Sequence, residues 1–383
     1  MSKWLGRIAI FLSAGAILVG GTTWLLPVSS LRQWFTTLPI VAQSIAFPHI
    51  WLVGSLLLAF VFGLLTLGFV LFGARPREGS PAAQERRRRI WTTATVAVCW
   101  AVASVSPLLG ITPLSARAVA TGPVEEGWRL LNVLEWNVAS QVHADEVRSL
   151  LRERVVDVAV LPEQDADRIS IDGYKLFEST TAGKIAPVTV AVRNSLGSYR
   201  QVPINELTFG ALLLEPDVGM AGERWLPRIL AVHAAPPVPG LMGKWRADLE
   251  QIAALARYYR PSAKDPRPLV IVGDFNAANW HGALGDLDGY VDALEWLDPL
   301  RRGTWPSVVP GPTVFEGVMR TPIDHILLPA AAATDTLASP HDAAPGAVRV
   351  GHVELLRRPS SDHIAIYTML QFKELTGSGA AVP

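Results

Sequence analysis

Three long runs without charge in the first 114 residues constrain the fold most. Residues 50–73, "IWLVGSLLLAFVFGLLTLGFVLFG", contain no charged residue, and similar apolar runs occupy 8–26 and 90–112. A helix of 24 residues is roughly 36 Å long and exceeds a hydrocarbon core of about 30 Å. We therefore predict three transmembrane helices, at about 8–26, 50–73 and 90–112.

Two alternatives remain open for these runs. Lys3 and Arg7 precede the first run, as in a cleaved signal peptide, although no small-residue cleavage site follows it cleanly. The second alternative is that all three runs are core helices of a soluble protein, but such a core does not readily accommodate three long charge-poor helices.

The arginine distribution predicts an orientation. The segment 74–89, "ARPREGSPAAQERRRR", carries six arginines, whereas 27–49 carries only Arg32. Excess arginine marks the cytoplasmic side, so the N-terminus and the 74–89 loop are expected in the cytoplasm. The chain is then a multi-pass plasma-membrane protein whose remainder is extracytoplasmic. A nucleic-acid patch is the alternative interpretation of the four-arginine run.

Charge and cysteine content constrain the outer part. The chain has 34 basic and 34 acidic residues, and 9 basic and 2 acidic ones precede residue 115, which leaves a net charge of −7 for the rest. Proteins that grip long nucleic acid usually present a basic face, and this part has no such excess. Cys99 is the only cysteine and lies in the third run, so no disulfide is expected. We predict a linker at 115–127, a catalytic domain at 128–373 and a disordered tail at 374–383.

The outer part alternates short apolar runs with helical patterns. The predicted helices are 144–154 and 241–260. The predicted strands are 130–138, 155–163, 188–194, 210–216, 228–234, 268–276, 321–329 and 362–370. Many strands with few long helices predict an α+β fold of two packed sheets with helices outside. Periodicity alone leaves a doubly wound sheet open.

Charged and polar residues recur at the ends of these runs. In "LVIVGDFN", Asp274 and Asn276 share one face of the strand and Phe275 points back into the core. An Asp/Asn turn cap is the plain structural alternative for a single such motif. The other strand ends carry Asn137, Glu163, His233, Asp324, Asp362 and His363. Random caps favour Gly, Ser and Asn, so this set predicts a shared site at one rim.

The motifs resemble the endonuclease/exonuclease/phosphatase superfamily, the metal-dependent phosphoesterases of the deoxyribonuclease I kind. The resemblance covers roughly 130 to 370 and implies a two-sheet α/β sandwich. It rests on WN (136–137), LPE (161–163), VHAAPP (232–237), GDFN (273–276), IDHI (323–326) and SDH (361–363).

The resemblance implies a metal site. Glu163 matches the main metal-binding carboxylate, and Asn137 and Asp362 match groups that bind the metal with it or support it. Carboxylate and amide oxygens suit a hard divalent ion, so the expected cofactor is Mg²⁺, with Mn²⁺ as the alternative.

The resemblance also implies catalytic roles. Asp274 matches the residue that orients or deprotonates the attacking water, and Asn276 matches one that holds a phosphate oxygen. His363 matches a histidine that contacts the phosphate and is held by Asp324. His233 matches the proton donor to the leaving oxygen. Phosphoryl transfer needs these functions: an aligned nucleophile, neutralised phosphate charge and a protonated leaving group.

Some positions depart from the family pattern or stay unassigned. Pro162 stands where the family usually has Gln, which affects packing more than chemistry. Some members use an active-site tyrosine, and Tyr174 and Tyr199 are unsupported candidates. His325 faces opposite Asp324 in its strand and is expected to be structural.

One segment points to a subgroup. Residues 303–326 are similar to bacterial membrane-anchored members, some of them linked to glycopeptide resistance. The Trp305-Pro306 turn and the apolar residues 308–319 after it either contact lipid or pack over the sheet. Arg224 and Arg228 also have two possible roles, as contacts to phosphate or as charges on the surface.

These observations predict a membrane-tethered, Mg²⁺-dependent hydrolase of phosphate ester or pyrophosphate bonds. Tethering and the acidic outer part favour a lipid-linked substrate, a polyprenyl pyrophosphate or a phospholipid. The alternative is an extracellular nuclease or nucleotide phosphatase, and the third hypothesis is an inactive binding module. Nucleic acid is the less favoured partner, and the bilayer is the expected one.

Overall fold

The computed structural model of the chain separates into two compact units, residues 1–114 and 115–383, which are described one at a time. It describes residues 3–26, 29–110, 116–120, 124–140, 142–179, 186–217, 225–262, 264–287, 289–309, 319–330 and 346–375.

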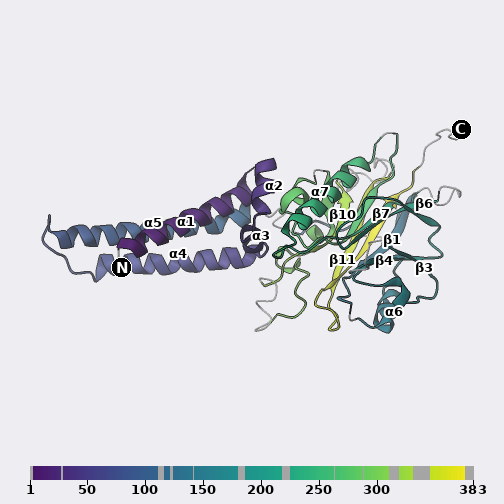
Figure 1. Cartoon of the computed structure of the whole chain (residues 1–383), viewed down its shortest axis with the longest axis horizontal. Helices are drawn as coiled ribbons and strands as arrows, with labels where there is room; N and C mark the ends of the chain where they lie inside the picture. Colours follow the sequence, from purple (N-terminus) through teal and green to yellow (C-terminus); the bar gives the residue numbers. More distant parts are fainter. Residues whose placement is uncertain are drawn as a thin grey trace. The chain divides into compact units, whose positions relative to one another are not determined.

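The first unit is helical (Figure 1). Its helices are α1 (Lys3–Gly20), which continues into a π-helical turn (Gly21–Leu25), α2 (Ser30–Thr36), α3 (Val41–Ile45), α4 (Pro48–Leu71) and α5 (Pro81–Gly110). Three helical segments are long and apolar enough to cross a membrane, namely Trp4–Leu25, Pro48–Leu71 and Pro81–Pro107. The three predicted apolar helices are therefore present.

The long helices present apolar surfaces outward and pair their polar groups with one another. On α4, Leu57 and Phe60 are 60% and 64% exposed, which is unfavourable in water over so large a surface and favourable in lipid. Between α4 and α5, Thr66 Oγ1 donates to Thr93 Oγ1 at 2.8 Å, and Trp51 Nε1 donates to the Ala103 carbonyl at 3.2 Å. Such interhelical hydrogen bonds are typical of membrane helix bundles.

The prediction of a loop over 74–89 was wrong for its second half. α5 begins at Pro81, so the four arginines 86–89 are helical. The backbone N–H of Ala83 donates to Ser80 Oγ, and Glu85 pairs with arginines three and four positions later in the helix. A helix in a polar segment is stabilised by a proline in its first turn, by a serine cap and by ion pairs between residues three or four positions apart.

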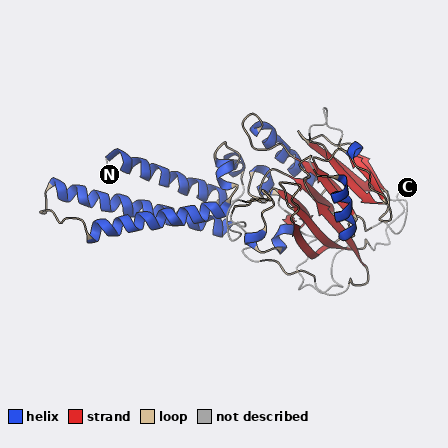
Figure 2. Ribbon diagram, turned by 90° about the horizontal axis from the view of Figure 1, so that it is seen from below, coloured by secondary structure: helices blue, strands red, loops and turns tan. Residues whose placement is uncertain are grey.

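The second unit contains two six-stranded sheets, drawn in red in Figure 2. The first sheet has the order β11 (Val348–Leu356), β12 (Ala365–Lys373), β1 (Trp128–Glu135), β2 (Val158–Pro162), β4 (Val188–Arg193), β3 (Tyr174–Glu178). The second has the order β5 (Tyr199–Val202), β6 (Gly210–Pro216), β7 (Arg228–His233), β8 (Leu269–Asp274), β10 (Asp324–Pro329), β9 (Tyr290–Asp292). This confirms the predicted α+β sandwich and excludes one doubly wound sheet.

Each sheet is built around one parallel pair of strands. β1 and β2 are parallel and are connected by α6 (Ala144–Glu153), and β7 and β8 are parallel and are connected by α7 (Met242–Tyr258). The other pairs are antiparallel, and short 3₁₀ turns lie at 166–168, 282–286, 293–296 and 299–301. Parallel neighbours end at the same edge of a sheet, so the chain following each pair emerges at one rim.

The core lies between the sheets and follows the two-residue strand period. Leu131 and Val133 of β1 belong to the same buried cluster as Val270 and Val272 of β8. The alternate residues of β1 pack in a second cluster on the outer face, beneath α6. The amphipathic pattern of α6 is thus explained, because one helix face covers the first sheet.

Four strands were missed from the sequence: β3, β5, β9 and β11. β3 and β5 are short edge strands that contain charged residues, and β11 contains a register shift between Val350 and His352. β2 starts at Val158 instead of 155, because Val155 has φ 52° and ends the turn after α6.

Part of the predicted linker is attached to the domain. The Arg117 backbone N–H donates to the Glu295 carbonyl, and the two side chains form an ion pair at 2.6 Å. The Ala120 N–H donates to the Val350 carbonyl at 2.8 Å. The predicted disordered tail lies outside the described residues from 376 onward.

Candidate active site

The ends of three neighbouring strands bring three titratable side chains together. In the strand register, Asp274 at the end of β8 is paired with His233 of β7 on one side and with Asp324 of β10 on the other. The two-residue period that buries Val270 and Val272 in the core gives Asp274 the same inward direction. His233 Nε2 lies 3.7 Å from Asp274 Oδ2.

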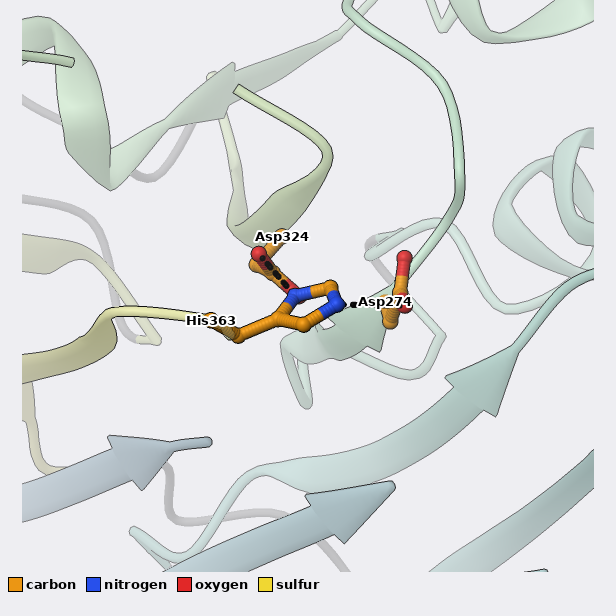
Figure 3. A group of neighbouring side chains, drawn as sticks. All are labelled: Asp274, Asp324 and His363. Atoms are coloured by element: carbon orange, nitrogen blue, oxygen red, sulfur yellow. Dashed lines mark hydrogen bonds and ion pairs between the residues drawn. The ribbon is translucent and has the colours of Figure 1, made fainter. Parts of the chain in front are cut away.

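His363, which precedes β12 in the opposite sheet, completes this group. Its Nδ1 lies 3.0 and 2.9 Å from the two Asp324 oxygens, and its Nε2 lies 3.9 Å from Asp274 Oδ2. The imidazole therefore lies between the two carboxylates (Figure 3). Burial alone lowers the pKa of His363, but the charge and hydrogen bond of Asp324, with the charges of Asp274 and Asp362, raise it to about 10. The ring is an imidazolium at neutral pH.

Asp274 is the centre of the hydrogen-bond network. Its Oδ2 accepts from Asn137 Nδ2 at 2.9 Å, and its Oδ1 accepts from the backbone N–H of Asn276 at 2.7 Å. Burial and the nearby Asp324 charge raise the pKa of Asp274, while His363 and His233 oppose that shift. A carboxylate with a raised pKa in a site of this kind is suited to accept a proton.

Glu163 reaches the site by a local change in backbone conformation. Strand alternation alone places it with Leu161 on the outer face of the first sheet. At φ 63° its backbone leaves the strand, and its Oε1 lies 3.4 Å from Asn137 Nδ2. Ser140 Oγ donates to Glu163 Oε2 at 3.2 Å. Unlike Asp274, Glu163 is only half-buried, so one carboxylate of the network is accessible.

The GDFN turn requires its glycine. Gly273 has φ 143°, and a Cβ there would lie 2.0 Å from the Val232 carbonyl oxygen, so β7 and β8 approach too closely for any other residue. Phe275 is fully buried, as the strand period predicts. Asn276 Nδ2 donates to the Ala234 carbonyl at 3.0 Å, which places its amide beside Asp274.

The 361–363 segment is fixed by hydroxyl groups. Ser361 Oγ donates to the Asn137 carbonyl at 2.6 Å and accepts from the His363 N–H at 3.0 Å. Asp362, between them, points elsewhere: it is exposed, and its Oδ2 accepts from Trp305 Nε1 at 3.0 Å. Its charge still acts on His363.

The structure thus brings together seven of the eight predicted site residues and places Asp362 at the periphery. The seven are Asn137, Glu163, His233, Asp274, Asn276, Asp324 and His363. Three come from the first sheet and four from the second. Such convergence explains why charged residues end so many apolar runs.

Other candidates have structural partners. The buried His325 bonds to Asp292 at 2.6 Å and to the Ala277 carbonyl at 2.7 Å, on the side of β10 opposite Asp324. The hydroxyls of Tyr174 and Tyr199 donate to backbone carbonyls. Arg228 pairs with Glu215 and Asp265 at the other end of β7 from His233. Arg224 and residues 310–318 lie outside the described residues.

Sequence reasoning missed Glu135. It is the last residue of β1, is fully buried, and interacts electrostatically with Asp324 and Asp274. The signal was present, because an acid inside the apolar run "LLNVLEWN" at the same parity as Leu131 and Val133 must face the core.

A model of the "Endonuclease/Exonuclease/phosphatase family" matches residues 134–363, more than half of the chain. The chain belongs to the endonuclease/exonuclease/phosphatase family. The match begins within β1 and ends at His363, so it spans all seven converging residues. No curated protein matches the chain.

Solved structures of this family's fold are similar at low identity. TDP2 of D. rerio, complexed with single-strand DNA product, is 20% identical, with 63% of this chain and 98% of that chain covered and a TM-score of 0.45. The 3′ phosphatase NExo of Neisseria, bound to product DNA hairpin, is 20% identical over 62% and 98%, with a TM-score of 0.42. An endonuclease/exonuclease/phosphatase family protein of Bacteroides thetaiotaomicron is 12% identical over 67% and 100%, with a TM-score of 0.43.

Members of the endonuclease/exonuclease/phosphatase family are metal-dependent phosphoesterases. The donor set fits a divalent cation. Carboxylate oxygens of Asp274 and Asp324 lie within 4.8 Å of one another, and Glu163 adds an accessible carboxylate linked to Asp274 through Asn137. Asp324 accepts the His363 hydrogen bond and both Asp274 oxygens accept hydrogen bonds, so the half-buried Glu163 offers the most accessible carboxylate. Oxygen donors of this kind suit hard divalent cations.

Proposed function

We propose that this protein is a membrane-tethered, extracytoplasmic hydrolase of phosphate ester or pyrophosphate bonds in a lipid-linked substrate. One observation carries the phosphoesterase part: a buried Asp274 carboxylate flanked by the Nε2 atoms of His233 and His363, at 3.7 and 3.9 Å. Both distances exceed a hydrogen bond, so both ring nitrogens are directed at the carboxylate without being bonded to it. A phosphate oxygen is the natural partner for each.

The roles follow from these positions. Asp274 accepts the proton of the attacking water, and Asn137 and the Asn276 N–H hold its carboxylate in place. The His363 imidazolium, fixed through Nδ1 by Asp324, presents Nε2–H to a phosphate oxygen. Charge that develops on the phosphate is stabilised by such preorganised donors.

His233 delivers the proton that the leaving oxygen needs. Its Nδ1 bonds to the Ala186 carbonyl at 3.1 Å, so Nδ1 is the donor there, and Nε2 faces the site. The edge of Phe209 packs against the ring, with 5.1 Å between centroids, and restricts its rotation. The proton count balances when His233 enters the reaction as an imidazolium: water gives one proton to Asp274, and the leaving oxygen takes the Nε2 proton of His233, which keeps Nδ1–H.

Glu163 and Asn137 are the proposed ligands of a divalent cation, Mg²⁺ or Mn²⁺, with Asp362 as a supporting charge. When bound, the cation supplies positive charge for the phosphate oxygens and for the attacking water. Asn276 is the proposed partner of a further phosphate oxygen.

Membrane attachment and charge support a lipid-linked substrate. The same chain carries three helices long enough to cross a bilayer, and the part after residue 114 has the net charge of −7 given above. An acidic domain disfavours long nucleic acid, and a tether favours substrates that reside in the same bilayer. Polyprenyl pyrophosphates and phospholipids are the proposed classes.

A substrate panel tests this proposal. We expect the full chain in detergent micelles to release phosphate or headgroup from polyprenyl pyrophosphate or phospholipid with Mg²⁺, and EDTA to abolish the reaction. Sphingomyelin and duplex DNA complete the panel. If the protein cleaves DNA readily and leaves the lipid substrates uncleaved, the nuclease alternative is established instead. A protein that cleaves none of the four would count against hydrolysis altogether.

The proposed orientation predicts a labelling pattern. In a Cys99→Ser background, which removes the only cysteine, Glu78→Cys and Glu250→Cys place one exposed thiol in each unit. A membrane-impermeant maleimide added to intact cells is expected to label the Glu250→Cys protein at once and the Glu78→Cys protein only after permeabilisation. The cysteine-free parent is the blank, and the reversed pattern would place the domain in the cytoplasm.

A further inference from the structure

Asp248 is an acid on the buried face of α7, the helix that follows His233. Its buried neighbours on that face include Trp245, Leu249 and Ile252, and Asp248 itself is only 5% exposed. Residues three and four positions apart share one face of a helix, so α7 carries a single carboxyl group within an apolar surface. Burying a carboxyl group is unfavourable without hydrogen-bond partners, so the partners of Asp248 indicate what it does.

Both oxygens of this carboxyl group accept hydrogen bonds from two segments that are distant in sequence. Oδ2 accepts from the backbone N–H of Ala235 at 2.8 Å. Oδ1 accepts from the backbone N–H of Thr208 at 3.1 Å and from its Oγ1 at 3.0 Å. Burial raises the pKa of Asp248, and these bonds and the charge of His233 oppose that shift. Asp248 therefore ties the chain after β7 to the chain before β6.

The Ala235 bond fixes the backbone where it leaves His233. Ala234 lies between these two residues, and its N–H donates to the Asp274 carbonyl at 3.0 Å. The Ala234 carbonyl accepts from Asn276 Nδ2 at 3.0 Å. The segment that Asp248 holds on this side thus connects His233 to the GDFN turn.

The Thr208 bonds fix the segment that packs against the His233 ring. Phe209 follows Thr208, and its ring meets that of His233 edge on, with 5.1 Å between centroids and 68° between planes. Gly210, the next residue, is paired with His233 in the β6–β7 ladder. Asp248 therefore anchors both the backbone that carries the imidazole and the aromatic ring that restricts its rotation.

We propose that Asp248 is a positioning residue, which holds the His233 ring in the orientation from which Nε2 delivers its proton to the leaving oxygen. The inference rests on the proposed function, because it assumes that His233 is the proton donor. Asp248 acts through Ala235 and Phe209, and His233 contacts the reacting atoms. A purely structural role, in which Asp248 only fixes α7 to the sheet, would affect stability without a selective effect on proton delivery.

A pair of substrates that differ only in one nitro group isolates proton delivery. Methyl p-nitrophenyl phosphate releases p-nitrophenolate, which needs no proton near neutral pH. Methyl phenyl phosphate releases phenolate, a stronger base whose conjugate acid resembles the tyrosine side chain, with a pKa of about 10. For the full chain in detergent with Mg²⁺, we expect Asp248→Ala to lower kcat for the phenyl ester by about 10- to 100-fold and for the nitrophenyl ester by at most about 3-fold. His233→Ala should show the same selectivity with a larger loss.

A double variant tests whether Asp248 acts through His233. The kcat of the Asp248→Ala, His233→Ala protein for the phenyl ester should lie within about 2-fold of that of His233→Ala alone, because a missing ring has no orientation to lose. If the loss in the double variant equals the product of the two single losses, Asp248 acts independently of His233 and the proposal is wrong. An equal loss of both esters in Asp248→Ala would also overturn it.

Asp157→Ala is the matched control. Asp157 is also an acid whose pKa is raised by burial, and its carboxylate accepts from the backbone N–H of Asn132 at 2.9 Å. Its kcat should stay within about 2-fold of wild type for both esters. Asp248→Asn is the second variant, which keeps the shape and one acceptor oxygen, and we expect the same selectivity with a loss of about 3- to 10-fold. If neither Asp248 variant folds, the acid is structural and the proposal is wrong.

Failure of the proposed function would give a different result. Wild-type protein without Asp274-dependent hydrolysis of either ester contradicts the proposed function itself. A His233→Ala protein that loses both esters equally contradicts the role of His233 and, with it, this proposal. Wild-type kcat for both esters in Asp248→Ala, beside a selective loss in His233→Ala, contradicts only the role of Asp248.

Discussion

Replacing Asp274 by Asn should lower kcat by about 10³-fold or more while the protein remains folded. The amide has nearly the shape of the carboxylate, and its one oxygen can still accept from the Asn276 N–H, so the turn is preserved. It cannot accept a proton from water, and a general base contributes about 10²- to 10⁴-fold. Steady-state hydrolysis of the best panel substrate, with the melting temperature as a check on folding, measures the effect.

Asp157→Asn is the matched control for Asp274→Asn. Asp157 is also an acid with a pKa raised by burial, and its carboxylate accepts from the Asn132 N–H at 2.9 Å. It follows α6 and is not among the converging residues. The Asp157→Asn protein should have the kcat of wild type. If the Asp274→Asn protein also has a kcat close to that of wild type, Asp274 is not the general base.

Replacing Asp324 by Asn should lower kcat at neutral pH by about 10²-fold or more. The Asp324 charge and hydrogen bond raise the pKa of His363 against the opposing effect of burial. Without them the pKa falls, and the ring loses its proton near neutral pH. The phosphate then loses a charged donor, whose removal typically costs 10²- to 10³-fold.

The pH dependence distinguishes this loss from general damage. Wild-type His363, with a pKa of about 10, stays protonated across the neutral range. In Asp324→Asn the imidazolium returns only as pH falls, so the ratio of variant to wild-type kcat should rise towards acidic pH. A ratio that does not change between pH 5 and 8 would show that protonation of His363 is not what the variant lost.

The chain offers a second Asp–His pair as a control. Asp292 bonds to His325 at 2.6 Å, and both are buried, but His325 lies on the opposite side of β10 from the site. Asp292→Asn should reduce stability as Asp324→Asn does, and its kcat per folded protein should be close to wild type at every pH.

The sequence predicted the parts of the site that depend on strand period. Asp274 faces the site and Phe275 is buried on the other side because side chains alternate along a strand, whereas Asn276 lies beyond the end of β8 with φ 49°. Glu163 could be matched to the family motif, but its direction could not be derived, because it depends on a backbone with φ 63° that strand alternation does not foresee. The same period directs Glu135 inward, because it has the parity of Leu131 and Val133, which belong to the core.

The missing strands have a different cause. β3 and β5 are edge strands, whose polar faces resemble loops, and they are strands because β4 and β6 offer free hydrogen-bonding edges. Such pairing is a long-range property that no local window contains. For the same reason, the pairing of His233 with Asp274 and of Asp324 with Asp274 appears only when the sheet is assembled.

The position of β12 in the first sheet has a consequence for biosynthesis. β12 is the last of the strands that the structure describes, yet it pairs with β1, the first of them, and His363 immediately precedes it. A ribosome must therefore synthesise the chain through β12 before the imidazole of His363 can join Asp274. Until that step, the proposed site lacks the histidine that is expected to contact the phosphate.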